Sequence, residues 1–164
     1  MASNFQKFLK DYTKHAVAGS SKLLATIGGA HIYNIQIDKD MDNGTIVAKG
    51  DIVDAKQEVY AVKESTGFAG KIIGKAANGN WYVEVVTPGD ALLMLQVPLL
   101  YEEYTKELQH ESQFYNANGD IVRCYELRTG DVFELSAEGF DSGTPEAGKD
   151  VSVTATTCKL TVAA

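Results

Sequence analysis

The chain has 164 residues, 45% of them hydrophobic and 23% charged, which is the composition of one folded domain with its own core. This length excludes two large domains, and the hydrophobic content excludes a chain that is disordered throughout. The net charge is -7 and no cluster of Lys or Arg is present, so we expect no nucleic-acid partner.

Membrane and redox signals are weak. No apolar run approaches the roughly 20 residues that span a bilayer, and the N-terminal sequence MASNFQKFLKDYTKH is too polar for a signal peptide. We therefore expect no membrane partner and synthesis in the cytoplasm. The two cysteines, Cys124 and Cys158, lack the CxxC spacing of a zinc or redox site. We expect two buried thiols, and a bridge between their segments stays open.

The N-terminus has the pattern of a short amphipathic helix. SNFQ is a capping-box pattern. Four apolar residues lie at helical spacing: Phe5, Phe8, Leu9 and Tyr12. We predict a helix from about Asn4 to His15, then a linker in AVAGSSKLLATIGGA, where small residues recur. Residues 1–29 are thus interpreted as an arm and residues 30–164 as a β-rich body.

From residue 30 onward, short runs rich in β-branched and aromatic residues alternate between apolar and polar side chains, as in half-buried strands. Such runs are HIYNIQI, TIVAK, EVYAVK, GKIIGK, NWYVEVVT, ALLMLQV, DIVRCYEL, DVFEL, VSVTA and KLTVA. They predict a mainly β body, either a β-barrel or a β-sandwich of β-tulip-like form. The N-terminal arm with its short helix and one short helical insertion complete the predicted fold.

Turn signals separate these runs. Asn-Gly occurs at residues 43–44, 78–79 and 118–119, and each pair is expected to reverse the chain because it tolerates the positive φ angles of tight turns. Gly-Asp precedes apolar residues at 50–51, 89–90, 119–120 and 130–131. We interpret each Asp as an acceptor of backbone N–H groups where a strand starts. The stretch Phe140–Lys149 is predicted to be a loop.

One segment, PLLYEEYTKELQHESQFYN, fits a helix better than a strand. We predict about two helical turns after Pro98, with an extended surface excursion as the alternative. Its aromatic cluster consists of Tyr101, Tyr104, Phe114 and Tyr115. Two interpretations stay open: these side chains cap the core, or they form a contact surface, for which tyrosine is well suited. The arm either folds back onto the body or docks on a neighbour, and we favour the neighbour.

The stretch DKDMDNG, residues 38–44, resembles the start of a calcium loop. When it is aligned on its three aspartates, however, Asn43 stands where an EF-hand needs Gly and Lys49 where it needs Glu. We interpret the stretch as the exposed tip of a tight hairpin.

No other motif indicates catalysis. The GxxG of TGFAGKII fits neither a KH loop nor a P-loop and is interpreted as a glycine-bent strand or turn. No two of His15, His31 and His110 have metal-ligand spacing, and no G-x-S-x-G elbow is present. We predict no enzyme activity, and no catalytic residue, cofactor or metal site.

Four stretches combine short strand-like runs with similarly placed turn residues: MDNGTIVAKGDIV, AANGNWYVEVVTPGDALLMLQVPLLYEEY, FYNANGDIVRCYELRTGDVFELSAEGF and GTPEAGKDVSVTATTCKLTV. They resemble small structural proteins of tailed bacteriophages, above all head proteins of phages of Gram-positive bacteria. The likeness covers most of residues 32–162. It implies a capsid decoration, or cement, protein, which binds the outside of the major capsid protein lattice, commonly as a homo-oligomeric trimer. It also implies a location on the capsid exterior of the virion.

In such proteins an N-terminal arm reaches across capsid subunits. The candidate capsid or oligomer contacts are Phe5, Phe8, Leu9, Tyr12, Tyr101, Tyr104, Phe114 and Tyr115. The hypothesis predicts that removal of residues 1–29 abolishes lattice binding and leaves the body folded. One alternative is another phage structural subunit of the tail tube, neck or head fibre. An alternative of another class is a β-barrel that binds a small molecule or carbohydrate, with Trp81 or Tyr82 as the stacking face.

Overall fold

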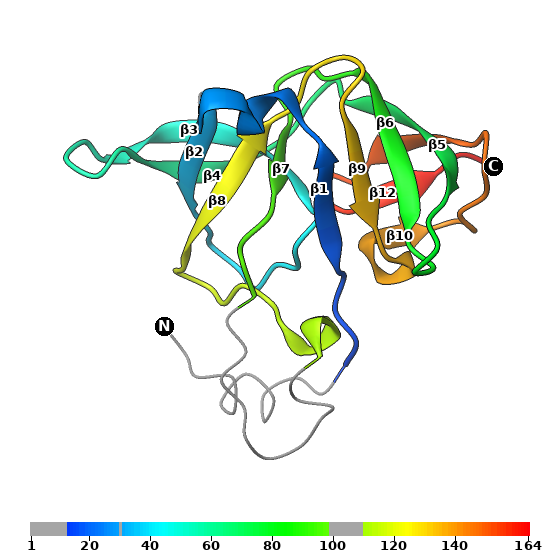
Figure 1. Cartoon of the computed structure of the whole chain (residues 1–164). Coiled ribbons are helices and arrows are strands. Elements are labelled where there is room, and N and C mark those ends of the chain that lie inside the picture. The colour runs from blue at the N-terminus through cyan, green and yellow to red at the C-terminus, as the bar shows by residue number, and fades with distance from the viewer. Residues whose placement is uncertain (1–12, 30, 99–109) are drawn as a thin grey trace.

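The structure of the chain is a computed structural model, which describes residues 13–29, 31–98 and 110–164. Its elements are mostly strands, arranged as a closed barrel beside a second, curled sheet (Figure 1). The predicted mainly β fold with a barrel is confirmed. Within the described residues, no helix is long and apolar enough to cross a membrane.

The barrel is a ring of five strands: β2 (Ile32–Gln36), β4 (Val59–Glu64), β3 (Ile46–Asp54), β7 (Leu92–Met94) and β8 (Ile121–Glu126), with β8 closing onto β2. β2 and β4 run parallel, and the other neighbours are antiparallel. Side chains such as Ile35, Val47 and Met94 are fully buried and belong to one apolar cluster. Closure of the ring leaves none of its strands with a free edge.

The second sheet has seven strands, in the order β1 (Ala18–Lys22), β9 (Val132–Leu135), β6 (Trp81–Thr87), β5 (Ala69–Lys75), β11 (Asp150–Val153), β12 (Leu160–Val162) and β10 (Phe140–Ser142). Val83 is opposite Ile72 on one side and Phe133 on the other. All three are fully buried, and Val85, two residues along β6, is buried too. One face of the sheet is therefore apolar, as the period of two predicts.

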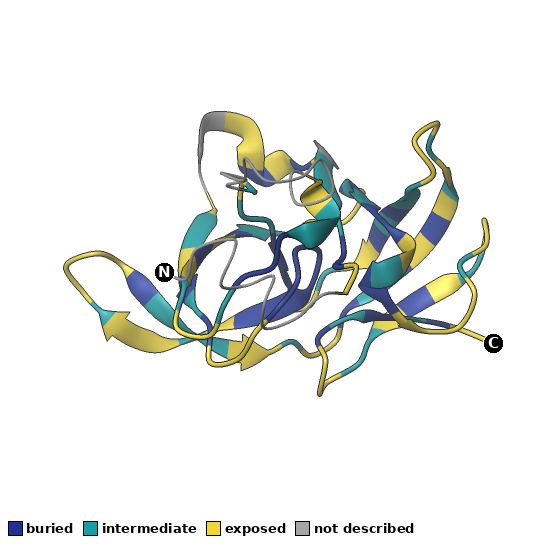
Figure 2. Ribbon diagram, turned by 90° about the horizontal axis from the view of Figure 1, so that it is seen from below, coloured by how far each residue is buried: buried dark blue, intermediate teal, exposed yellow. Residues whose placement is uncertain are grey.

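The two sheets share a core. Ile46 and Leu93 of the barrel cluster with Val85 and Leu135 of the second sheet, and Figure 2 shows the buried segments of both gathered in the interior. In the described part of the chain, three short 3-10 helices join the strands: η1 (Leu24–Gly29), η2 (Glu111–Gln113) and η3 (Ala137–Gly139).

All the predicted strands are present, but the predicted linker is wrong. Within it lies β1, which pairs with β9 through Ala18 and Leu135. Ala16, Leu23 and Ala25 are 2%, 4% and 2% exposed, so they belong to the core. Small residues such as AGSS do not alternate between apolar and polar side chains, and periodicity therefore does not reveal this strand.

Three further predictions concern loops and helices. The predicted loop Phe140–Lys149 begins with β10, which gains its order by pairing in parallel with β12. Most of the predicted N-terminal helix lies outside the described residues, and its last positions, 13–15, are not helical. The predicted helix after Pro98 falls on residues 99–109, which also lie outside the described residues.

Candidate functional site

The stretch DKDMDNG contains a buried turn and not the exposed hairpin tip that we predict from sequence. Asp42 and Asn43 are only 8% and 4% exposed. β2 and β3, which flank the stretch, pair with other strands and not with each other. The Asn-Gly turn itself is present, with Gly44 at a φ of 85°.

Gly44 fits this turn tightly against the neighbouring elements. Its N–H donates to the Met94 carbonyl at 2.8 Å. A Cβ added at Gly44 would lie 2.3 Å from Leu135 Cδ1 and 3.2 Å from the Ala18 Cβ. Both the positive φ and this close approach require glycine. The turn thus lies between the end of β7 and the strands β1 and β9.

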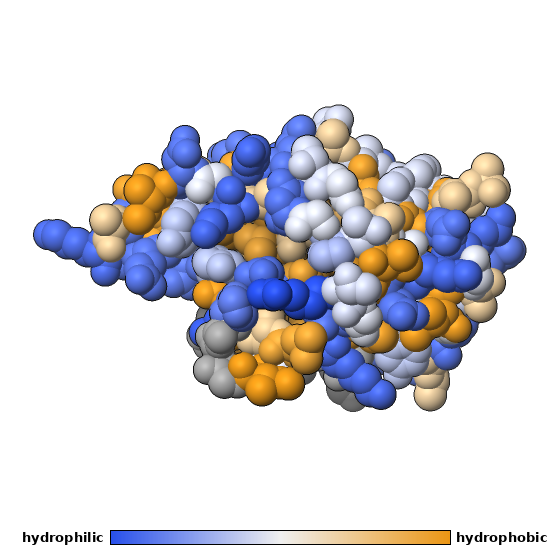
Figure 3. Space-filling model, turned by 90° about the horizontal axis from the view of Figure 1, so that it is seen from above, coloured by the Kyte–Doolittle hydropathy of each residue, from blue (hydrophilic) through white to orange (hydrophobic). Residues whose placement is uncertain are grey.

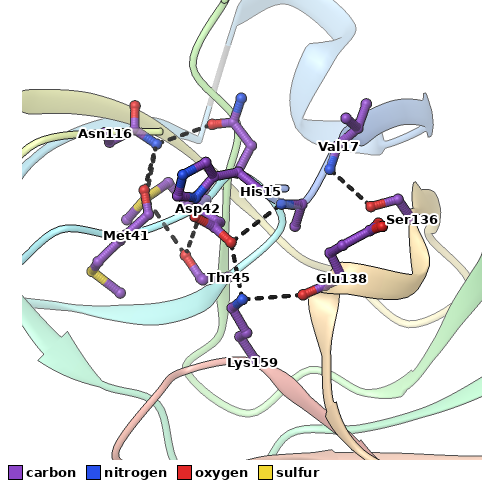
Figure 4. A network of polar contacts seen from close by, with 12 residues as sticks. His15, Val17, Met41, Asp42, Thr45, Asn116, Ser136, Glu138 and Lys159 are labelled. Atoms are coloured by element: carbon purple, nitrogen blue, oxygen red, sulfur yellow. Dashed lines mark hydrogen bonds and ion pairs between the residues drawn. The ribbon is translucent and has the colours of Figure 1, made fainter. Parts of the chain in front are cut away.

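The carboxylate of Asp42 is surrounded by donors (Figure 4). His15 Nδ1 lies 2.7 Å from Oδ1, and Lys159 Nζ lies 2.9 Å from Oδ2. The backbone N–H of Ala16 donates to Oδ2 at 3.2 Å. Burial alone would raise the pKa of Asp42, but the hydrogen bonds from His15 and Lys159 outweigh it and hold this pKa below its usual value.

The partners of Asp42 are themselves anchored. Lys159 Nζ also donates to the Glu138 carbonyl at 3.0 Å. The His15 ring packs on the Tyr115 ring with a centroid separation of 4.7 Å, and the His15 backbone N–H donates to the Ser112 carbonyl at 2.7 Å. The N-terminal segment is therefore attached both to the turn and to the residues that precede β8.

Asn43 ties the same turn to two further segments. Its Nδ2 donates to the Gln96 carbonyl at 2.8 Å, and its Oδ1 accepts the Gln96 N–H at 3.0 Å. Asn116 Nδ2 also donates to Asn43 Oδ1, at 3.1 Å, and the backbones of Asn116 and Met41 form a β-bridge. We refer to Asp42 and Asn43 together with His15, Ala16, Gln96, Asn116 and Lys159 as the hub.

The hub joins the bases of the two segments that carry most of the predicted contact residues. His15 is near the start of the described chain, while Gln96 precedes the segment 99–109 and Asn116 follows it. The described chain borders both segments at the same end of the molecule, the lower end in Figure 1 and the face seen in Figure 2. The hub thereby fixes where the two segments leave the body.

The hub contacts join separate segments of the chain, so we interpret the role of the hub as structural. The cation on the Asp42 carboxylate is the ammonium group of Lys159. Among residues 13–29, 31–98 and 110–164, no group of three or more His, Cys, Asp or Glu side chains is placed to hold a metal ion.

Most predicted contact residues lie outside the described part of the chain: Phe5, Phe8, Leu9, Tyr12, Tyr101 and Tyr104. Phe114 and Tyr115 are described, and they are 6% and 2% exposed. Both side chains are therefore buried, and the role of these aromatic residues as contacts stays a prediction.

The Gly-Asp interpretation is confirmed at three of its four positions. Asp90 accepts the Thr66 N–H, Asp120 accepts that of Ala117 and Asp131 accepts that of Arg128, at distances of 2.7, 3.1 and 2.8 Å. Each of these aspartates lies just before β7, β8 or β9. The fourth pair, at residues 50–51, lies inside β3, so the interpretation is wrong there.

The remaining motifs have structural roles. Cys124 and Cys158 are buried free thiols, as expected, and burial raises the pKa of each. The GxxG is a bent turn at Gly67, with a φ of 77°, that leads to Gly70 in β5, as predicted.

Sequence reasoning misses the hub almost entirely. The concentration of acidic residues beside Asn-Gly in DKDMDNG is its one visible signal, and no local pattern identifies His15 or Lys159 as partners of Asp42. The comparisons with known proteins name no relative: no protein-family model, curated protein or solved structure matches the chain.

Proposed function

We propose that this chain is a non-enzymatic structural protein of a tailed-phage virion, which decorates the capsid by binding the major capsid protein lattice. The observation that carries the proposal is the hub, which holds the bases of residues 1–12 and 99–109 at one end of the body. Most of the aromatic residues nominated as contacts lie in these two segments. Together with the sequence resemblance, this arrangement favours one docking end.

The proposed mechanism is binding to the assembled lattice alone. A partner that binds the assembled shell, and not its separated subunits, stabilises the shell by its own binding free energy. The hub holds the described residues that flank the two segments in place before docking, and such preorganisation lowers the entropic cost of binding. The buried hub would serve this role without contacting the capsid.

The experiment is co-sedimentation of the purified protein with empty, expanded heads of the phage that encodes it, after its oligomeric state has been measured by size-exclusion chromatography with light scattering. We expect a small, defined oligomer that sediments only with heads. A chain lacking residues 1–12 should bind heads at least about tenfold more weakly, since about 1.4 kcal/mol of lost contact energy has this effect. Truncation must stop at residue 12, because Ala16, Leu23 and β1 belong to the folded body.

A protein that ignores heads would contradict the proposal. Rings or tubes formed by the protein alone in electron micrographs would instead support a tail-tube subunit. Glycan binding that disappears in Trp81→Ala would support the carbohydrate-binding alternative, although Lys75 Nζ already lies 5.2 Å from the centroid of the Trp81 ring.

A further inference from the structure

A second polar cluster lies away from the hub, where η1 packs on the ends of β2 and β8. A hollow of about 230 Å³ is lined there by Leu24, Ala25, His31, Glu126 and Arg128. Figure 3 shows the molecule from above, a face on which hydrophobic and hydrophilic residues lie side by side. None of these residues takes part in the hub.

Glu126 organises the cluster through both carboxylate oxygens. Its Oε2 lies 3.0 Å from His31 Nδ1 and accepts the Tyr33 hydroxyl at 3.3 Å. Its Oε1 lies 2.9 Å from Arg128 Nη2. Burial, followed by the nearby charge of Glu126, raises the pKa of Tyr33, so the phenol remains a neutral donor. Both oxygens of the Glu126 carboxylate therefore already have partners, and these contacts position His31, Tyr33 and Arg128.

His31 is held in an uncommon conformation. Its φ is 64°, in the left-handed region that residues with a side chain seldom adopt. Two contacts to one residue fix it there, because the Glu126 N–H donates to the His31 carbonyl at 3.0 Å while the Glu126 carboxylate binds the ring. Residues held in such conformations by their surroundings are enriched at ligand-binding sites, although Glu58 and Cys158 also have a positive φ in this chain.

His31 and Arg128 each have polar positions that Glu126 does not contact. With Nδ1 bound to Glu126, the His31 ring has Nε2 for a ligand, and the guanidinium of Arg128 has further N–H groups beside the one on Glu126. The two side chains are 50% and 48% exposed. We propose that His31 and Arg128 form an anion-binding site for a carboxylate or a group of similar charge, such as sulfate.

The surroundings favour a carboxylate attached to a short apolar group. Leu24 and Ala25 form the apolar wall of the hollow, and Leu24 separates it from a second hollow, of about 460 Å³, that is lined by Lys22 and Ile27 among others. The carboxylate of Asp131, which also lines this second hollow, accepts the backbone N–H groups of Leu24 and Arg128. These two hydrogen bonds hold the start of η1 and the backbone of Arg128 in place beside the hollow.

Charged groups from several elements surround the hollow. The charged or titratable groups around His31 are Glu126 and Arg128 from β8 and the turn after it, and Tyr33 from β2, whose ring is covered by Lys49 of β3. From η1 the hollow receives only Leu24 and Ala25.

The test uses the isolated full chain and NMR titration of the His31 imidazole and Arg128 guanidinium signals. Sodium sulfate and sodium succinate are the probes, with sodium chloride at equal ionic strength as the control for screening. The variant is Arg128→Gln, and the matched control is Arg123→Gln, an exposed arginine on β8 outside the hollow.

We expect saturable shifts at pH 6 that weaken about tenfold in Arg128→Gln, the effect of one lost hydrogen bond to a charged group, and that persist in Arg123→Gln. Shifts that do not saturate, or that are equal in Arg128→Gln and the unmodified chain, would overturn the site.

A second experiment, which rests on the proposed function, distinguishes two sources of the anion. If the anion is a carboxylate of the capsid, Arg128→Gln binds heads more weakly than Arg123→Gln, and succinate competes with heads. If it is a free metabolite, both variants bind heads equally while the NMR shifts remain. Because the titration needs no heads, failure of the decoration proposal and failure of this site give different results.

Discussion

At the scale of single residues, Asp42 is a buried carboxylate that joins segments far apart in the sequence. A buried carboxylate is costly unless charged or polar donors compensate for lost hydration. Asp42 has two charged or chargeable partners and a backbone N–H. Removal of the Asp42 charge would leave the Lys159 ammonium group without its ion-pair partner. The Lys159 side chain is only 27% exposed, so water would compensate for this loss only in part.

Asp42→Asn should therefore lower the free energy of unfolding by about 3 kcal/mol, the typical cost of breaking a buried pair from one side. The measurement is urea unfolding followed by circular dichroism. Asp38→Asn is the matched control, because Asp38 belongs to the same stretch and is exposed, and it should change stability by less than about 0.5 kcal/mol. Equal effects of the two substitutions would contradict the importance of the hub.

The stability difference between the unmodified chain and Asp42→Asn should also depend on pH. The folded-state pKa of Asp42 is lower than its ordinary value, so its charged form stabilises the fold above the unfolded pKa of about 3.9. This stabilisation is lost as the pH falls through the folded pKa. Urea unfolding of both proteins at decreasing pH should show the difference shrinking below about pH 4. A difference that is constant to the lowest pH would refute the assignment.

At the scale of elements, one dipeptide serves two different turns. Asn78-Gly79 connects β5 and β6 on the surface, and nothing lies within 4 Å of a Cβ added at Gly79. Asn43-Gly44 has the same positive φ at glycine but lies between the barrel and the second sheet. The dipeptide thus specifies the turn, while its environment decides whether the turn is exposed or buried.

Gly44→Ala and Gly79→Ala separate these two effects. Gly79→Ala should cost about 1 kcal/mol, from the left-handed backbone alone. Gly44→Ala should cost about 3 kcal/mol, because overpacking against Leu135 and Ala18 is added to the same backbone term. Thermal and urea unfolding provide both values. A cost for Gly44→Ala no larger than that for Gly79→Ala would mean that the packing around Leu135 adapts without strain.

At the scale of the whole molecule, the N-terminal segment from residue 15 is part of the body. β1 adds a strand to the edge of the second sheet next to β9, and His15 and Ala16 bind the turn at Asp42. The boundary between any arm and the body is therefore set by tertiary contacts and not by the glycine-rich composition of the segment.

Two truncations should consequently behave differently. Removal of residues 1–12 should leave a cooperative thermal transition, since none of the described hub contacts is lost. Removal of residues 1–29 should abolish that transition or lower its midpoint strongly, because it deletes β1, two hub residues and the buried Leu23 and Ala25. Circular dichroism melts and hydrogen exchange of β9 provide the comparison. A stable body after the longer deletion would restore residues 13–29 to the arm.

The sequence by itself determined the parts of the fold that depend on neighbours along the chain. Alternation placed the strands from β2 to β9, β11 and β12, and the Asn-Gly and Gly-Asp pairs placed most of the turns, because pleat direction and φ preference are local properties. The buried state of both cysteines also followed, since isolated thiols behave as small apolar side chains.

Only the tertiary structure decided the hub, β1 and the cluster at Glu126. Asp42 meets His15 and Lys159 across 27 and 117 positions of sequence, and no short-range pattern encodes such pairings. β1 gains its hydrogen bonds from β9, which follows it by more than a hundred residues. Asp42 and Asn43 are buried for the same reason: closure of the barrel against the second sheet brings donors to the Asp42 carboxylate, and these donors replace the water that burial removes.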